Sequence, residues 1–381
     1  MNKLEEARKI INDIDEQMAK LFEKRMSAAA MVAEYKKEHG LPVLDASRER
    51  AVMQKVSDLT GTEFEAYART LYQTLMDVSK AYQNEVIGDT TPLTEKITQL
   101  ANESPKVFPK RASVSCQGCE GAYSQAAAEK LFRAPEIVYH KDWDGVFKAV
   151  SSGLTQYGIL PVENSTAGSV NRIYDLLAKH NVSIVRSVRV KVDHNLLALP
   201  GAKIENIRKV YSHEQAIQQC SDLLASMENA RAIPCANTAV AAKNVAESGD
   251  LTQAALSSRL CARLYGLTPL VEGAQNTDHN YTRFICIAKE PQIFAGADRT
   301  SLMLELPHQP GSLFRILSLL NAIGANLTKL ESRPIPGRDF EVLFYFDIEE
   351  SVHSPEFARM LCQLEHASEK FRYLGTYSEI I

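Results

Sequence analysis

Apolar side chains recur every three to four residues through the first part of the chain, as they do along one face of an α-helix. Gly40 and Pro42 end the first such stretch, and Asp45 is a suitable N-cap for the second. At 1.5 Å per residue the first helix would be about 50 Å long, which exceeds the width of a domain of this size. We therefore expect it to cross a partner helix from a second subunit. The predicted helices cover residues 2–37, 46–59 and 63–87.

From about residue 112 the hydrophobic pattern changes, and short β-prone runs alternate with helical stretches and glycine turns. This alternation predicts α/β structure over residues 112–290. The preceding residues, 91–111, are rich in Thr, Pro and Lys and indicate a linker with room for one short helix. The β-prone runs fall at 157–162, 182–192, 195–199, 210–212 and 283–288.

A further module is predicted over residues 299–377. Its elements follow the order βαββαβ, which is that of a ferredoxin-like α+β domain. The chain is therefore expected to be multidomain, with an all-α domain over residues 1–90 in front of the α/β region. The distribution of Gly and Pro agrees with this division. Residues 1–90 hold three Gly and one Pro, and the remaining residues hold fifteen Gly and fourteen Pro.

Charged residues interrupt the apolar stripe of the first helix. Arg25 lies in this stripe, and Lys36, eleven residues later, points within about 20° of it. Arg8 lies about 100° around the helix from Arg25, so it would reach the same pocket only from a crossing subunit. Together with polar residues of the next two helices, the candidate set is Arg8, Arg25, Lys36, Asp45, Arg48, Glu49, Ser79 and Gln83.

These eight residues resemble, in order and approximate spacing, the active site of the all-helical chorismate mutase domain. The resemblance covers about residues 3–88 and implies an intertwined homodimer, or a higher homo-oligomer, that converts chorismate to prephenate without a cofactor. It further implies that Arg8, Arg25 and Arg48 clamp carboxylates, while Lys36 and Gln83 donate to the ether oxygen. Glu49 would hold the ring hydroxyl, and Asp45 and Ser79 would support the pocket.

Composition limits the other possibilities. The formal net charge is −4 and 45% of residues are apolar, which favours folded domains and argues against a nucleic-acid partner. We expect no membrane partner and a cytoplasmic location, because no apolar run approaches the ~18 residues of a membrane span and no signal core opens the chain. Seven scattered Cys favour free thiols, and the lone Cys116-x-x-Cys119 pair predicts no metal site.

Polar loops follow the predicted strands of the central region, where ligands of α/β folds bind. A Gly turn over residues 118–121 precedes a helix, which suits an anion. Other polar loops begin at Glu163, Tyr211 and Asn237, and the segment Asn280-Tyr281-Thr282-Arg283-Phe284 precedes the last strand of the region.

Together these loops resemble prephenate dehydratase over about residues 112–290, and Thr282-Arg283-Phe284 is the most specific match. The resemblance implies two α/β lobes of periplasmic-binding-protein type around a cleft, in which prephenate loses CO₂ and its 4-hydroxyl, with Thr282 as the hydrogen-bond or proton donor. Cys119 replaces the family's usual Pro. Arg283 would bind a carboxylate or form a structural ion pair, and His213 would act as a base or simply pack. Further expected substrate contacts are Asn164, Ser165, Thr166, Ser212, Gln219 and Thr238.

The C-terminal module resembles an ACT domain, a small-molecule sensor that pairs across a dimer. Its Glu331-Ser332-Arg333-Pro334 segment matches the motif of phenylalanine-regulated dehydratases. The loop Gly311-Ser312-Leu313 matches the partner loop, although Ser312 and Phe314 replace the usual Ala and Val. The resemblance implies feedback inhibition by L-phenylalanine.

The leading hypothesis is a bifunctional enzyme of phenylalanine synthesis. One alternative keeps the dehydratase and makes the helical domain a dimerisation device. Another is a non-catalytic binding protein that senses an amino acid. Arogenate also remains open as a substrate of the dehydratase.

Overall fold

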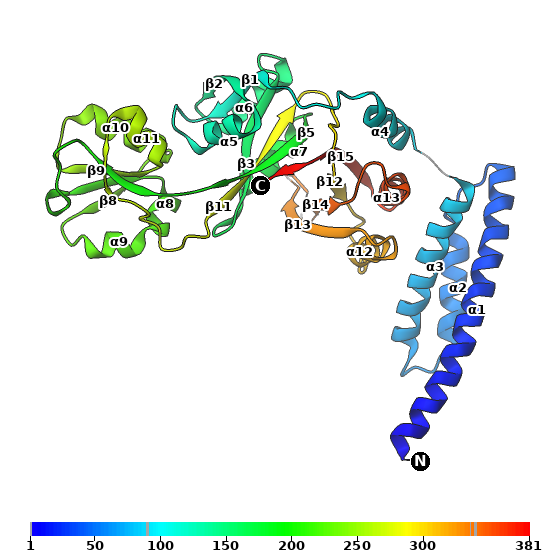
Figure 1. Cartoon of the computed structure of the whole chain (residues 1–381). Helices are drawn as coiled ribbons and strands as arrows, with labels where there is room; N and C mark the ends of the chain where they lie inside the picture. Colours follow the sequence, from blue (N-terminus) through cyan, green and yellow to red (C-terminus); the bar gives the residue numbers. More distant parts are fainter. Residues whose placement is uncertain (1, 89–90, 336, 339–340) are drawn as a thin grey trace.

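The computed structural model describes residues 2–88, 91–335, 337–338 and 341–381. A helical domain lies at one end of the molecule and a two-lobed α/β region at the other, with the C-terminal α+β module between them (Figure 1). Within the described ranges, no helix combines the length and apolar character needed to cross a membrane.

The helical domain has the three helices that the apolar pattern predicts. The side chain of Asp45 accepts a hydrogen bond from the Arg48 backbone N–H and so begins the second helix at the expected residue. The third helix begins two residues later than predicted, because residues 62–64 form a turn. The helices are α1 (Lys3–His39), α2 (Ala46–Leu59) and α3 (Glu65–Ile87).

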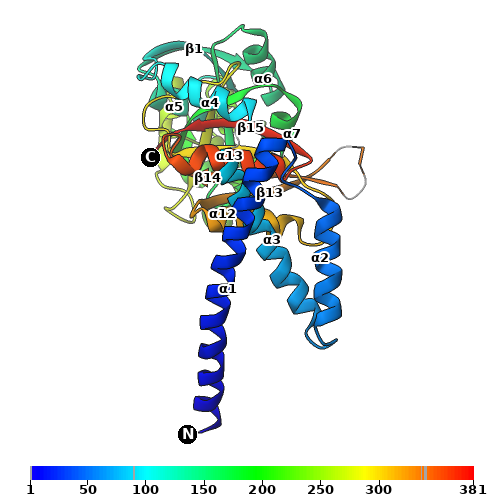
Figure 2. The same ribbon diagram turned by 90° about the vertical axis from the view of Figure 1, so that its right-hand side faces the viewer.

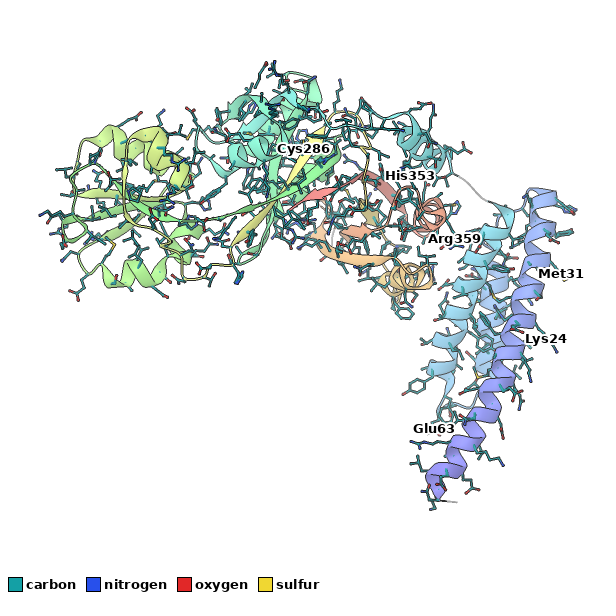
Figure 3. All side chains as sticks on the ribbon, viewed as in Figure 1. Lys24, Met31, Glu63, Cys286, His353 and Arg359 are labelled. Atoms are coloured by element: carbon teal, nitrogen blue, oxygen red, sulfur yellow. The ribbon has the colours of Figure 1, made fainter. Side chains whose placement is uncertain are left out.

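The N-terminal half of α1 extends beyond α2 and α3 (Figure 2). Its apolar side chains are exposed, with Ile14 at 48% and Leu21 at 62%. Figure 3 places Lys24 and Met31 on the outer side of the same helix, and Met31 is 71% exposed. One copy of this domain therefore leaves much of the apolar surface of its longest helix uncovered.

The predicted linker contains a packed helix. Helix α4 (Pro92–Glu103) begins with a reciprocal capping pair between Thr91 and Thr94. Its Ile97 is 1% exposed and belongs to the core of the C-terminal module. Segment 91–111 is thus partly an element of that module, because one face of α4 is apolar enough to be buried there.

The first lobe of the α/β region is built on a seven-stranded sheet of order β16-β5-β11-β3-β1-β2, with β4 paired to β3. In β11 and β3, Thr282 lies directly opposite Asn164. The strands are β1 (Arg111–Gln117), β2 (Ala134–His140), β3 (Tyr157–Asn164), β4 (Gly168–Ser169), β5 (Ser183–Lys191), β11 (Tyr281–Ala288) and β16 (Glu379–Ile380). The helices are α5 (Tyr123–Leu131), α6 (Trp143–Ser152) and α7 (Asn171–Lys179).

The second lobe has a five-stranded sheet of order β10-β6-β9-β7-β8. The chain enters this lobe through residues 192–194 and returns through residues 272–280, so two crossovers join the lobes. Its strands are β6 (Asn195–Ala198), β7 (Lys209–Ser212), β8 (Arg231–Pro234), β9 (Gln253–Ser257) and β10 (Thr268–Val271). Its helices are η1 (Ile204–Asn206), α8 (Glu214–Gln219), α9 (Ser221–Ser226), α10 (Thr238–Ser248) and α11 (Arg259–Tyr265).

The C-terminal module has the predicted βαββαβ order and a sheet of order β13-β14-β12-β15. One face of the sheet packs on α12 and α13, and the other shares a core with the first lobe through residues such as Tyr345 and Leu374. The elements are β12 (Arg299–Glu305), α12 (Ser312–Ala322), β13 (Asn326–Pro334), β14 (Val342–Glu349), α13 (Pro355–His366) and β15 (Lys370–Tyr377).

Strand β15 approaches the first lobe closely. A Cβ placed on Gly375 would lie 2.0 Å from the carbonyl oxygen of Ile184, so only glycine fits there. Immediately afterwards β16 pairs in parallel with β5. Strand β16 therefore forms one edge of the first-lobe sheet, beyond the predicted module boundary at residue 377.

The module also contacts the helical domain. Arg315 of α12 lies 3.4 Å from the Asp77 carboxylate of α3, and Arg359 of α13 pairs with Glu85 at 2.8 Å. Figure 3 shows Arg359 on the side of the module that faces α3. Two ion pairs thus connect the module to the helix that carries Ser79 and Gln83.

Candidate active sites

The first candidate site lies between the three helices of the helical domain. The half-buried Arg25 of α1 donates from Nη1 to the Ser79 hydroxyl of α3 and, at 3.1 Å, to the Leu75 carbonyl. These contacts hold the guanidinium at the α1–α3 interface. A guanidinium held in this way can meet a carboxylate, which such groups bind in a bidentate manner.

A second cation, missed in the sequence pattern, lies beside the predicted Glu49. Lys80 of α3 pairs with Glu49 at 2.6 Å and with Asp77 at 3.0 Å. Asp77 also faces Arg315 of the C-terminal module. Glu49 is therefore linked, through Lys80 and Asp77, to a residue of the module. Sequence spacing could not identify Lys80, because it lies next to Ser79 and about 100° away on the same helix.

Lys36 and Gln83 are two further predicted residues, on α1 and α3. Lys36 donates to the Val43 carbonyl at 2.6 Å, across the α1–α2 connection. The Gln83 Oε1 atom is buried without a hydrogen-bond partner among the described residues. A buried amide oxygen without a partner costs free energy, and the NH₂ group of the same side chain is the one that can donate to a ligand.

The other three predicted residues lie outside this cluster. Asp45 and Arg48 are exposed at the N-terminus of α2, where the Arg48 backbone N–H donates to the Asp45 side chain and forms the helix cap. Arg8 is exposed on the free half of α1. Within one chain Arg8 therefore lies apart from Arg25, as the helical geometry predicts.

The second candidate site is a cleft of about 460 Å³ between the two α/β lobes. Thr282 and Asn164 line it from the first lobe, where they are cross-strand neighbours. The Asn164 Nδ2 atom donates to Thr282 Oγ1 at 3.0 Å. Gln219 and Thr238 line it from the second lobe, and Thr238 is the first residue of α10. These four predicted residues share one cavity.

Three other predicted contacts do not line the cleft. Ser165 donates to the His279 carbonyl, and the buried Ser212 donates to the Leu256 carbonyl at 2.7 Å. Thr166 bonds the Asn164 side chain at 2.7 Å, so it supports a lining residue. The resemblance predicts that all three contact the substrate, whereas here their hydroxyls bond protein atoms, two from the loop after β3 and one from the end of β7.

For Arg283 the sequence left two roles open, a carboxylate contact and a structural ion pair. Successive residues of a strand face opposite sides, so Arg283 lies on the other face of β11 from Thr282. It pairs with Asp347 of β14 at 2.5 Å, and Glu163 lies 3.5 Å from its Nε atom. Burial alone would lower the pKa of this guanidinium, but Asp347 raises it above its ordinary value. Arg283 is therefore an ion-pair partner between the lobe and the module.

Two histidines line the cleft. His213 caps α8, where its Nδ1 accepts from the Gln215 backbone N–H at 3.3 Å. His194, which was not singled out from the sequence, is 2% exposed and bonds Gln219. Burial lowers the pKa of His194, so the imidazole is neutral. Within the described residues, no cluster of three or more His, Cys, Asp or Glu could hold a metal ion.

The predicted effector residues form two separate groups in one chain. Gly311, Ser312 and Leu313 line a pocket of about 470 Å³ at the start of α12. The strand that carries the other group, β13, is at the edge of its sheet. Its Glu331 accepts from Ser169, and Arg333 pairs with Asp175 at 2.9 Å, both in the first lobe. Ser332 and Pro334 are exposed.

Two known families match this chain, one over the helical domain and one over the α/β region. Residues 7–84 match the family chorismate mutase type II, and residues 114–292 match the family prephenate dehydratase. A bifunctional chorismate mutase/prephenate dehydratase of Neisseria gonorrhoeae is 32% identical over 97% of this chain and 95% of its own length.

Two further similar proteins cover smaller shares of this chain. An arogenate dehydratase/prephenate dehydratase of Arabidopsis thaliana is 36% identical over 79% of this chain and 81% of its own length. The crystal structure of a prephenate dehydratase in complex with L-Phe from Arthrobacter aurescens superposes with a TM-score of 0.63 and 27% identity, covering 70% of this chain and 90% of that chain. The chain belongs to the bifunctional chorismate mutase/prephenate dehydratase family.

Proposed function

We propose that the two reactions of this family are divided between the helical site and the cleft. The helical site rearranges chorismate to prephenate. The cleft removes CO₂ and the 4-hydroxyl of prephenate and releases phenylpyruvate. The observation that carries this division is the position of Thr282, which shares the cleft with Asn164 and lies in a different domain from Arg25.

In the helical site, Arg25 binds a carboxylate of chorismate while Ser79 fixes its guanidinium. Lys36 and Gln83 donate to the ether oxygen as its charge develops, and Glu49 accepts from the ring hydroxyl. The rearrangement is intramolecular, so the protein supplies a compact conformer and charge stabilisation. Neither contribution requires a proton transfer.

A second subunit completes this site. The exposed apolar side chains on the free half of α1 supply an interface, and the antiparallel packing of two such helices would carry Arg8 to the partner's pocket. Arg48 binds the second carboxylate there, and Asp45 supports it from the N-terminus of α2. A homodimer is thus part of the mutase proposal.

In the cleft, the bond from the ring to its carboxylate breaks and releases CO₂. That electron pair enters the ring, the bond to the 4-hydroxyl breaks, and the hydroxyl leaves as water after taking up one proton. Thr282 donates to this leaving oxygen. Gln219 and Thr238 contact the substrate from the second lobe, which brings both lobes to one ligand.

The C-terminal module binds L-phenylalanine and inhibits the dehydratase. Because Gly311–Leu313 and Glu331–Pro334 are separate in one chain, the effector site forms where the edge strand β13 meets the loop of a second subunit. Glu331 and Arg333 already contact the first lobe, so effector binding at this strand would act directly on the dehydratase. Cytoplasmic location is part of the proposal, since the substrates are metabolites.

An ultraviolet assay tests the proposal. The purified chain is given chorismate or prephenate, with and without L-phenylalanine, and chorismate loss and phenylpyruvate formation are followed. Arogenate is given in a separate reaction in which L-phenylalanine formation is followed, because loss of CO₂ and water leaves its amino group in place. Both reactions should proceed, and L-phenylalanine should slow the second. If no phenylpyruvate forms from prephenate, the proposed dehydratase activity is wrong. If chorismate is not consumed, the proposed mutase activity is wrong and the helical domain serves only for dimerisation.

A further inference from the structure

The side chains around Thr282 form a closed ring of hydrogen bonds that joins both lobes and both crossovers. Asn164 belongs to the first lobe and Gln219 to the second. His194 lies in the first crossover and Asn280 in the second, and both are at most 2% exposed. The two crossovers are also joined by backbone, because the Val192 N–H donates to the Asn280 carbonyl at 2.8 Å.

The direction of every bond in this ring can be worked out from one fixed point. The Asn164 Oδ1 atom lies 3.1 Å from the Thr166 backbone nitrogen and 3.0 Å from that of Ala167. A backbone N–H can only donate, so this side of the Asn164 amide must be the oxygen. The opposite side is then the NH₂ group, which faces Thr282 and Asn280.

From this point the ring has only one consistent arrangement. Asn164 Nδ2 donates to Asn280 Oδ1 at 2.8 Å, so the NH₂ group of Asn280 faces Gln219. It donates to Gln219 Oε1 at 2.9 Å. The NH₂ group of Gln219 then returns to Thr166 Oγ1 at 2.7 Å and Asn164 Oδ1 at 3.4 Å. Three amides are thus oriented by two backbone N–H groups.

The same argument fixes the tautomer of His194. Its Nε2 atom lies 3.1 Å from Gln219 Oε1, which is an acceptor in this ring. Nε2 must therefore carry the hydrogen, and the lone pair of the neutral imidazole is on Nδ1. Nδ1 is buried without a partner in the part of the chain that the structure describes. His194 thus supplies the second donor that holds the Gln219 carbonyl in place.

We propose that His194 and Asn280 are positioning residues of the dehydratase, which hold Gln219 and the Asn164 amide in place beside Thr282. This inference rests on the proposed role of Thr282 in that reaction. Thr282 Oγ1 accepts from Asn164, so its own hydrogen must point elsewhere, and the cleft is the space that Thr282 lines. Reversing the Asn164 amide would place a carbonyl against Thr282 and draw its hydrogen away from the substrate.

The ring also depends on the relative position of the lobes. Gln219 comes from α8 of the second lobe, whereas Asn164 and Thr282 come from adjacent strands of the first. His194 and Asn280 hold Gln219 from the crossovers, which are the only covalent connections between the lobes among the described residues. Thr282 is therefore oriented to donate its hydrogen into the cleft when the two lobes have the relative position seen in this structure.

Paired variants of each residue test the inference. His194→Leu removes the donor to Gln219, while His194→Gln keeps an N–H donor on a side chain of similar length. Asn280→Asp keeps the shape of Asn280 but cannot donate to Gln219 when ionised. We expect His194→Leu and Asn280→Asp to lower kcat for prephenate by about 10–100-fold with KM changed less than about twofold. His194→Gln should recover most of kcat.

Three controls make the result decisive. His353→Leu, an exposed position of the module (Figure 3), should retain wild-type kcat. Chorismate consumption and the melting temperature are measured for every variant. If His194→Leu misfolds, the near-isosteric variant Asn280→Asp still tests the inference. Equal kcat values for His194→Leu and His194→Gln, or a wild-type kcat in Asn280→Asp, would overturn the inference. A wild-type chain that forms no phenylpyruvate would instead overturn the proposed function itself, and the inference with it.

Discussion

Arg283→Met gives the clearest separation between a structural and a substrate-binding arginine. Methionine keeps the apolar stem of the side chain and removes the charge. Asp347 would remain buried, with a side chain only 12% exposed and Ser301 as its hydrogen-bond donor at 2.5 Å. Removing one partner of a buried ion pair costs about 3–5 kcal/mol, because the remaining charge is uncompensated. We expect a loss of that size in the unfolding free energy.

The single tryptophan of the chain provides the assay. Trp143 packs against the core that the first lobe shares with the module, so its fluorescence in urea reports the unfolding of this interface. With an m-value of about 3 kcal/mol per M, the midpoint should fall by roughly 1–1.7 M. The matched control is Arg259→Met, since the Arg259–Glu272 pair is about 60% exposed and should cost at most ~1 kcal/mol.

Kinetics of the folded variant then decide the role of Arg283. Below the unfolding transition, KM for prephenate should stay within about twofold of wild type. The double variant Arg283→Met/Asp347→Leu should recover a large part of the lost stability, because no buried charge remains. An unchanged urea midpoint together with a KM raised about 100-fold would refute the structural assignment and return Arg283 to the substrate.

Three further substitutions test other parts of the molecule. Arg25→Ala should lower chorismate mutase activity by about 100–1000-fold and leave phenylpyruvate formation from prephenate unchanged, and equal losses in both assays would contradict separate sites. Gly375→Ala should destabilise the module–lobe interface by about 2 kcal/mol or more, because the added Cβ meets the Ile184 carbonyl. The Trp143 fluorescence assay measures this loss, and a wild-type urea midpoint would disprove the close approach. Burial lowers the pKa of His194 below its ordinary 6.5, so the unfolded chain binds a proton that the folded chain does not as pH falls through that value. Stability should therefore decrease by up to about 1.4 kcal/mol per pH unit below pH ~6.5, and His194→Gln should lack this part of the slope in urea titrations at pH 7, 6 and 5.

Local patterns in the sequence were sufficient to place most helices and strands. Helix α2 begins and ends at the predicted residues because Asp45 caps it and Gly61 follows it closely. The alternation of Thr282 and Arg283 on one strand also follows from the sequence. The alternation alone does not say whether Thr282 or Arg283 faces the cleft. That depends on the module sheet, which supplies Asp347 and begins more than ten residues later in the chain.

Residues that act through long-range packing were harder to predict. Strand β16 has only two residues, and its pairing partner β5 lies about 190 residues earlier, so no local period indicates it. Lys80, His194 and Asn280 gain their roles from neighbours on other elements. Asn280 lies in the predicted segment that carries Thr282, but its bond to Gln219 depends on the folding of the second lobe.

The most direct test of two separate sites in one chain is the product that Thr282→Ala forms from chorismate. The variant should consume chorismate at the wild-type rate and accumulate one equivalent of prephenate, while phenylpyruvate formation falls by about 100-fold or more. Thr282→Ser, which keeps the hydroxyl, should retain a substantial part of phenylpyruvate formation. Phenylpyruvate formed by Thr282→Ala at the wild-type rate would contradict the assignment of Thr282, and loss of chorismate consumption in the same variant would contradict the separation of the two sites.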